Sequence, residues 1–252
     1  MKVALVARSV YPLHGYGGLE RHVYDLARAL ADRDVDVTLV TRPPVKDREW
    51  SGSSVHPLVK VEFVPYRTFP LAGRRGTTVL DRSTAYPIFG LRAGRRARDL
   101  VERGRADIVH GLGASVLGYA RARRTASAPL VLNPQGLEEF GATDASRARL
   151  KRAAYLPLRR AVLTCAAAAD VVIATDRSLE SVVRHHLNVP AERVRTIPNA
   201  LDLVAIDTLT DPVFIADLRR RADIGAGDVV LFSAGRLEEN KGAISAGVDH
   251  LS

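Results

Sequence analysis

Cysteine is almost missing from this sequence. Cys165 is the only one in 252 residues, so the chain forms neither an intramolecular disulfide nor a cysteine-based zinc site, and a reducing compartment fits. No apolar run approaches the roughly 18 residues that a membrane-spanning helix needs. No secretory leader is expected either, because Met1-Lys2 passes directly into the apolar segment Val3–Ala7. These absences predict a soluble, cytoplasmic protein.

The sequence also lacks the G-x-G-x-x-G fingerprint of dinucleotide-binding proteins. Its first glycines, Gly15, Gly17 and Gly18, are bunched, and no glycine follows at Arg21. Aromatic residues are few, at 6% of the chain, so there is little to stack on nucleic-acid bases. A nicotinamide-dependent oxidoreductase is therefore only the third interpretation of this sequence, and nucleic-acid binding is the least favoured.

Positive charge, by contrast, is plentiful and uneven. The chain has 37 Lys and Arg against 28 Asp and Glu, and residues 67–160 alone hold 19 basic and 7 acidic residues. Such a region attracts phosphates, anionic lipid headgroups or nucleic acid. An arginine-rich composition without any binding role explains the same surplus equally well.

Strand-like and helix-like segments alternate along most of the chain. Short apolar runs predict strands at 3–7, 35–41, 59–64, 107–110, 129–133, 170–174 and 193–197. Apolar residues at helical spacing predict helices after Gly18 and over 88–103, 114–124, 144–169 with an interruption at Pro157, and 178–187. Residues 66–86 lack clear periodicity and predict a loop. This order predicts an α/β fold with a mostly parallel sheet and helices on both faces.

Strand-like and helix-like segments no longer alternate regularly after Asp202, and this change predicts a domain boundary there. A first domain over 1–202 is expected, then a linker with a helix over 203–227, then the start of a second domain over 228–252. That second domain opens with an apolar strand at 229–234, and such a strand needs neighbours on both sides. Too few residues follow it to supply them, so the second domain is expected to be incomplete.

The segment between the first strand and the first helix has the features of an anion site. Gly17 and Gly18 let the backbone approach a ligand, and the free amides and dipole of a helix N-terminus favour negative charge. A tight turn without a ligand accounts for the two glycines about equally well. Ligands of parallel α/β folds lie at the carboxyl ends of the strands, where we expect the functional residues.

Six segments in order resemble glycosyltransferase family 4, a nucleotide-sugar-dependent family with two facing Rossmann-like domains (the GT-B fold). They are Gly17–His22, Asp107–His110, Pro134–Phe140, Ala169–Ala174, Ile197–Asn199 with Asp202, and Gly235–Gly242. The resemblance implies that the first domain holds the acceptor and the second the sugar nucleotide, with transfer that retains the anomeric configuration. It implies a nucleotide-sugar co-substrate, no other cofactor and no metal.

For the donor diphosphate, the resemblance implies two pairs of residues. Gly17 and Gly18 would approach the diphosphate, and Arg236 and Lys241 would neutralise its charge as it leaves. By their spacing alone, Arg236 and Lys241 would be a solvated arginine and lysine that follow a strand.

For the reacting sugars, the resemblance implies His110, Gln135 and Glu138 as candidate catalytic residues. His110 would line the cleft, although a buried structural histidine is an equally good interpretation. Glu138 would bind a sugar hydroxyl, although a carboxylate at a helix start is also stabilised by the helix dipole. Two positions depart from the family: Gln135 replaces a histidine and cannot take up a proton near neutral pH, and Leu112 replaces a second histidine.

The sequence thus predicts a glycosyltransferase of carbohydrate biosynthesis that is truncated and inactive by itself. Its expected partners are a nucleotide-sugar donor and a sugar, lipid or small-molecule acceptor, without nucleic acid. The alternative is a stand-alone module that binds an anionic acceptor or a membrane surface through the arginines of residues 67–160. Either interpretation allows peripheral contact with the inner face of the membrane.

Overall fold

The structure is a computed structural model that describes residues 1–44, 55–67, 77–123, 125, 127–135, 137, 140, 153–200, 202–208, 211–225 and 227–230. Glu138, Arg236 and Lys241 lie outside the described residues, as does most of the strand predicted at 229–234. The chain divides into two compact units, Met1–Ala200 and Leu201–Ser252.

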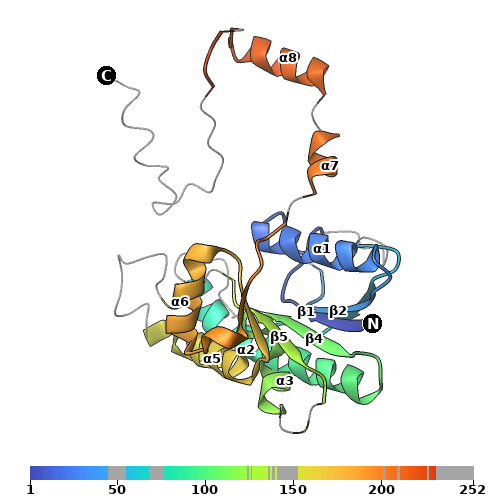
Figure 1. The fold of residues 1–252 in the computed structure, drawn as a ribbon, viewed down its shortest axis with the longest axis vertical. Helices are drawn as coiled ribbons and strands as arrows, with labels where there is room; N and C mark the ends of the chain where they lie inside the picture. The colour runs from blue at the N-terminus through green and yellow to red at the C-terminus, as the bar shows by residue number, and fades with distance from the viewer. Residues whose placement is uncertain are drawn as a thin grey trace. The chain divides into compact units, whose positions relative to one another are not determined.

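The first unit is built on a seven-stranded sheet in which neighbouring strands are parallel (Figure 1). The strands follow the order β3-β2-β1-β4-β5-β6-β7. Their bounds are β1 Lys2–Val6, β2 Asp36–Thr41, β3 Lys60–Phe63, β4 Ile108–Leu112, β5 Leu130–Asn133, β6 Val171–Ala174 and β7 Val194–Thr196. The predicted α/β fold with a parallel sheet is confirmed.

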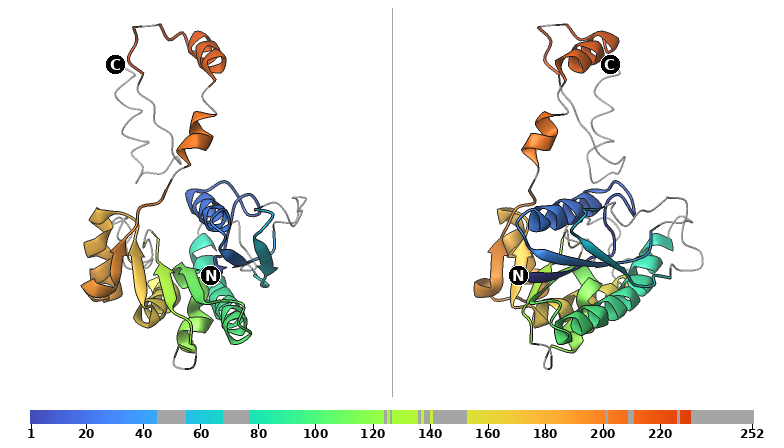
Figure 2. Two further views of the ribbon diagram at one scale, coloured as in Figure 1. Left: turned by 45° about the vertical axis from the view of Figure 1, so that its right-hand side comes forward. Right: turned by 90° about the vertical axis from the view of Figure 1, so that its right-hand side faces the viewer.

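Helices cover both faces of this sheet, as predicted (Figures 1 and 2). On one face, α1 (Gly18–Ala31) packs Val23 and Ala27 against Leu5 and Leu39 of the sheet. The other face carries a larger core built by α2, α3, α5 and α6. The bounds of these helices are α2 Thr77–Glu102, α3 Leu117–Arg121, α5 Leu156–Ala168 and α6 Arg177–Leu187.

Strands β1 and β4 are neighbours in the sheet, and the helices that follow them lie on opposite faces. From β1 the chain passes to α1 on one face, and from β4 to the 3-10 helix η1 (Gly113–Val116) and α3 on the other. Buried Ser115 joins the two strand ends, since its Oγ donates to the Val6 carbonyl at 2.6 Å and accepts from the Leu112 N–H at 3.1 Å. Such a switch point is where ligands bind in parallel sheets.

Helix α2 approaches η1 and α3 closely because glycines line the contact. A Cβ at Gly90 would overlap the carbonyl of Ala114, and one at Gly118 would overlap the carbonyl of Leu91. Gly94 faces the backbone of α3 in the same way. Only a residue without a side chain lets two backbones come this near, so these glycines determine how closely α2 packs.

Helix α2 begins at Thr77 rather than at residue 88, so the loop predicted over 66–86 is wrong from Thr77 onward. The loop was predicted because residues 66–86 lack clear helical periodicity, and the helix forms even though it contains Pro87, at a position where proline usually costs about 3 kcal/mol. Packing outweighs this cost: Ala85 and Phe89 are buried, and the Tyr86 hydroxyl donates to the Leu112 carbonyl at 2.8 Å. The predicted interruption at Pro157 coincides with the start of α5, where proline is well tolerated.

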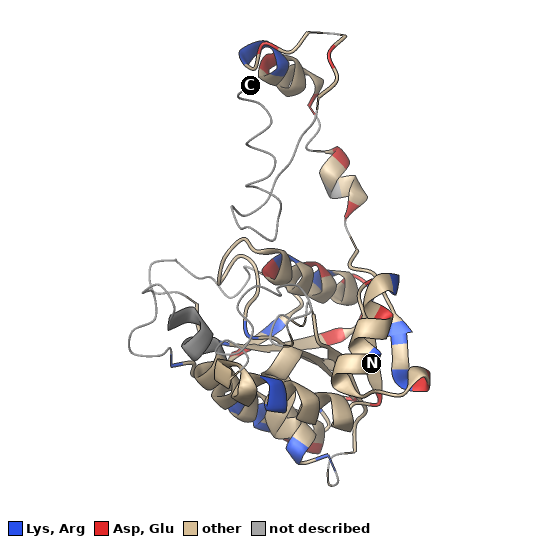
Figure 3. Cartoon of the chain, turned by 90° about the vertical axis from the view of Figure 1, so that its left-hand side faces the viewer, with Lys and Arg blue, Asp and Glu red and all other residues tan. Residues whose placement is uncertain are grey.

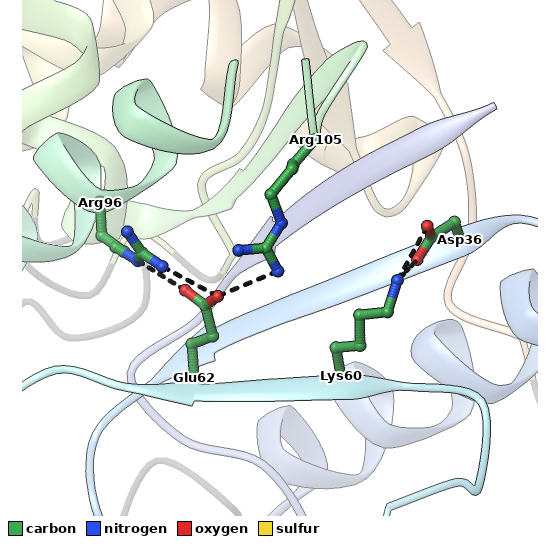
Figure 4. Close-up of polar contacts among 5 residues, drawn as sticks. All are labelled: Asp36, Lys60, Glu62, Arg96 and Arg105. Atoms are coloured by element: carbon green, nitrogen blue, oxygen red, sulfur yellow. Dashed lines mark hydrogen bonds and ion pairs between the residues drawn. The ribbon is translucent and has the colours of Figure 1, made fainter. Parts of the chain in front are cut away.

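Ion pairs hold the edge strand β3 to its neighbours (Figure 4). Glu62 accepts two hydrogen bonds from Arg96 of α2, at 2.6 and 3.0 Å, and lies 3.3 Å from Arg105. The hydrogen bonds to Glu62 raise the pKa of Arg96. Lys60 pairs with Asp36 of β2 at 2.9 Å. Arg96 and Arg105 belong to the arginine-rich residues 67–160, so part of the positive charge of that stretch has a structural role.

In the second unit, the described residues form two helices, α7 (Leu203–Asp207) and α8 (Pro212–Arg221). Asp211 begins α8, because its carboxylate accepts from the Val213 N–H at 2.9 Å. None of the helices in the described part of the chain has the length and apolar character required to span a bilayer.

Candidate functional site

The turn between β1 and α1 places two glycines at the start of a helix. Gly17 is extended, with φ −70° and ψ 159°, and precedes the first residue of α1, Gly18. A Cβ at Gly18 would meet no atom within 4 Å, so its backbone faces open space. A Cβ at Gly17 would overlap the carboxylate of Glu20, which lies over this residue. Gly18 is therefore open at the position of a side chain, whereas Gly17 is covered by the carboxylate of Glu20.

His14 fixes the β1–α1 turn to the end of β2. The Val10 N–H donates to His14 Nδ1 at 3.0 Å, which leaves the Nε2–H to donate to the Arg42 carbonyl at 2.9 Å. Burial, and next the charge of Arg42, lower the pKa of His14. The imidazole is therefore neutral near pH 7 and acts as a bridge between two loops. The turn is held in place before any ligand binds.

His110 lies on β4 beside the switch point, on the face that α1 covers. Strand β4 runs two residues past the predicted end, so His110 lies within the strand rather than at its terminus. Its Nε2 is buried and has no hydrogen-bond partner among the described residues. Burial, and next the charge of His22, lower the pKa of His110 to about 4. At neutral pH this side chain can donate or accept a hydrogen bond but carries no charge.

A chain of contacts connects His22 of α1 to Gln135. Asn133, at the end of β5, is 2% exposed, and its Nδ2 lies 3.4 Å from His22 Nε2. Its Oδ1 accepts from the Gln135 N–H at 3.2 Å and so supports a left-handed backbone at Gln135, with φ 64°. The Gln135 side-chain nitrogen is buried without a hydrogen-bond partner among the described residues. Two predicted site residues, His110 and Gln135, are thus linked through His22.

The sequence prediction missed His22 and Asn133. His22 lies three residues after Leu19 and four before Leu26, so helical spacing places it with the buried face of α1. A polar residue on the buried face of a helix is the signal in the sequence that could have identified His22. Asn133 ends a predicted strand, where functional residues are expected, but its contact with His22 appears only in the folded structure.

The predicted site residues are only partly brought together by the described structure. Helix α1 begins at Gly18 and carries His22 one turn later. His110 and Gln135 lie near His22. Among the residues that the structure describes, no group of three or more His, Cys, Asp or Glu could hold a metal ion.

Acid is expected to destabilise the fold through His110. Its pKa is about 4 in the folded protein against an ordinary 6.5, so folding favours the neutral form. This stabilisation is complete above pH 6.5 and is lost as the pH falls toward 4, a total of about 3 kcal/mol. Urea unfolding at pH 7.0 and about pH 4.5 measures the loss, which should be smaller in His110→Gln than in wild type.

Comparison with wild type isolates His110, because every other histidine is the same in the two proteins. If wild type and His110→Gln lose the same free energy of unfolding between the two pH values, burial of His110 does not cause the acid sensitivity.

The chain was compared with known proteins by sequence and by structure. The model of Glycosyltransferase Family 4 matches residues 16–204. No curated protein sequence matches the chain. Among solved structures, sucrose-phosphate synthase from Thermosynechococcus elongatus superposes with a TM-score of 0.64 and 20% identity, over 96% of this chain and 57% of that one.

Two further solved structures are similar. The catalytic domain of starch synthase IV from Arabidopsis thaliana, bound to ADP and acarbose, has a TM-score of 0.55 and 14% identity, with 90% of this chain and 60% of that one covered. Anabaena HepE in complex with UDP has a TM-score of 0.52 and 18% identity, with coverages of 88% and 50%. The chain thus spans 50% to 60% of the length of these proteins.

At these identities the superpositions establish the fold, which is the Rossmann-like α/β fold of GT-B glycosyltransferases. The family model covers Gly17, Gly18, His110 and Gln135, which lie on elements next to the switch point of the sheet. The matched residues make up most of the sequence, and this chain belongs to Glycosyltransferase Family 4.

Proposed function

We propose that the protein transfers a sugar from a nucleotide-sugar donor to an acceptor, and that the unit Met1–Ala200 is the acceptor-binding side of the enzyme. The observation that carries this proposal is the open backbone at Gly18, at the N-terminus of α1 and beside the switch point of the sheet. A helix N-terminus with accessible backbone amides favours a diphosphate. The family match and the similarity to solved structures in complex with UDP or with ADP support a nucleotide donor.

The site residues have distinct roles in this proposal. Neutral His110 and Gln135 hydrogen-bond sugar hydroxyls, since each has a buried nitrogen without a hydrogen-bond partner among the described residues. Glu138 follows Gln135 closely in the chain and binds a further hydroxyl. Arg236 and Lys241 offset the charge of the leaving diphosphate, so that transfer needs no metal. We propose retention of the anomeric configuration as well.

Sugar transfer needs the nucleotide-sugar-binding domain in addition to the unit Met1–Ala200, which we propose is inactive by itself. The test is release of nucleoside diphosphate from a panel of nucleotide sugars by protein that contains both domains. Release that depends on added acceptor is the expected result. A protein that binds a nucleotide sugar yet releases nothing with any acceptor, sugar or lipid, would be a binding module rather than a transferase.

Contact with an anionic membrane is a second proposal, and the structure reduces the charge available for it. Basic and acidic residues are interspersed over the helices of the first unit (Figure 3). Arg96 and Arg105 share Glu62, Arg98 pairs with Glu102, and Arg123 pairs with Asp170. Such pairs leave less free charge for lipid headgroups, so sugar transfer is the better supported function.

A further inference from the structure

Two arginines follow neighbouring strands at the carboxyl edge of the sheet. Arg8 comes two residues after β1, and Arg42 directly follows β2. The parallel register pairs Val6 with Val40 and continues past it, because the Ala7 N–H donates to the Val40 carbonyl at 3.1 Å. Continuing this register by two residues brings Arg8 beside Arg42 at the ends of the two strands.

Alternation along the strands directs both arginines to the face that α2 covers. Val6 and Val40 belong to the core on this face, and Arg8 and Arg42 lie two residues further along each chain. The contacts agree: the Arg8 guanidinium carbon lies 4.9 Å from the ring centre of Tyr86, on α2. The glycine turn instead leads into α1, which covers the opposite face.

Aromatic rings hold both guanidinium groups in place. The Arg42 guanidinium carbon lies 5.4 Å from the ring centre of Tyr66, which packs edge-on against Phe89 at 5.8 Å. Tyr86 and Phe89 are three residues apart and so share one surface of α2. The Tyr86 ring is itself fixed by its hydrogen bond to the Leu112 carbonyl. The two cations therefore lie against one preformed aromatic lining.

The positive charge of Arg8 is not neutralised within the described residues. No carboxylate among them forms an ion pair with Arg8, and its buried Nε has no hydrogen-bond partner there. Buried Ser83, one turn before Tyr86 on α2, likewise has an Oγ without a hydrogen-bond partner in that part of the chain. Leaving a buried donor unsatisfied costs about 1–3 kcal/mol, and more for a charged group. An oxyanion would satisfy the donors of Arg8.

We propose that Arg8, with the charge of Arg42, binds an oxyanion group, phosphate or carboxylate, on the acceptor of the transfer reaction. The inference rests on the proposed function and adds the chemical class of the acceptor. A guanidinium offers two parallel N–H donors that match the oxygens of either group. The donor diphosphate and the acceptor anion approach from opposite faces of the sheet, which keeps the two anions apart.

Binding without any donor tests the site directly in the 252-residue chain. Glucose 6-phosphate, glucuronate, inorganic phosphate and neutral glucose are titrated by calorimetry, and the Arg8 Nε–Hε signal is followed by NMR. We expect glucose 6-phosphate or glucuronate to bind and to shift this signal, whereas glucose does not. Binding of glucose 6-phosphate would identify the acceptor anion as a phosphate, and binding of glucuronate would identify it as a carboxylate. Arg8→Gln should weaken binding about tenfold or more, as expected for loss of a charged hydrogen bond.

Arg95→Gln is the matched control, since Arg95 is exposed on α2 and its loss removes the same charge without touching the site. Arg8→Lys keeps the charge and should bind with intermediate affinity, which separates loss of the site from loss of folding. Equal affinity in wild type and Arg8→Gln, or an Arg8 signal that shifts with UDP alone, would overturn the proposal. Transfer activity does not enter this experiment, so its absence would count only against the proposed function.

Discussion

Gly18→Val is expected to reduce sugar transfer about a hundredfold or more in protein that contains both domains, the size of effect that a small displacement of a reacting group produces. A side chain at Gly18 would fill the open space through which the diphosphate approaches the N-terminus of α1. The fold should not change, because a Cβ at this position meets no atom within 4 Å. Initial rates and urea midpoints of wild type and variant provide the measurement.

Gly18→Ala provides a graded comparison, since one methyl group should reduce the rate less than the valine side chain does. Both variants should unfold within about 1 kcal/mol of wild type, because replacing glycine near a helix start changes helix propensity by no more than that. If Gly18→Val transfers sugar at the wild-type rate, Gly17 and Gly18 form a turn and nothing else.

The second large effect is expected at the contact between α2 and α3. A Cβ at Gly94 would lie 2.5 Å from the backbone nitrogen of Gly118 and would overlap that of Tyr119. Backbone atoms cannot rotate away as a side chain can, so the two helices must separate. Gly94→Ala should lower the free energy of unfolding by about 1–3 kcal/mol, the usual cost of overpacking. This loss of stability is expected although alanine stabilises a helix by about 1 kcal/mol relative to glycine.

The same substitution at Gly18 serves as the control for Gly94. Gly18→Ala adds the same methyl group to a helix at a position without a neighbour, so it should be neutral or slightly stabilising. Urea unfolding of both variants at pH 7 makes the comparison. Equal stabilities of the two variants would mean that α2 and α3 adjust to the added methyl group without cost.

Much of the fold could be predicted because strands and helices differ in periodicity. Short apolar runs such as Leu130–Asn133 and Val171–Ala174 have the pattern of strands buried on both faces, and the intervening helical segments call for parallel connections. The prediction failed around Pro87, where local propensity opposes the helix. Contacts of Tyr86 and Phe89 with distant segments decided the outcome there.

The candidate site was less predictable for a related reason. Gly17 and Gly18 could be proposed from the sequence because glycines before a helix have a local physical meaning. His22 and Asn133 are 111 residues apart and become neighbours only when α1 packs beside the ends of β4 and β5. Neither the orientation of Gln135 nor the burial of His110 has a signature in the order of residues.

By itself, the sequence determined most of the described strands and helices, because their periodicity is set by residues close together in the chain. Only the tertiary structure decided which strand ends are neighbours. The switch point between β1 and β4 collects His110 and the glycine turn, and the register of β1 and β2 places Arg8 beside Arg42. Burial then sets the charge of His110, since the pKa of an imidazole depends on the solvent that packing removes.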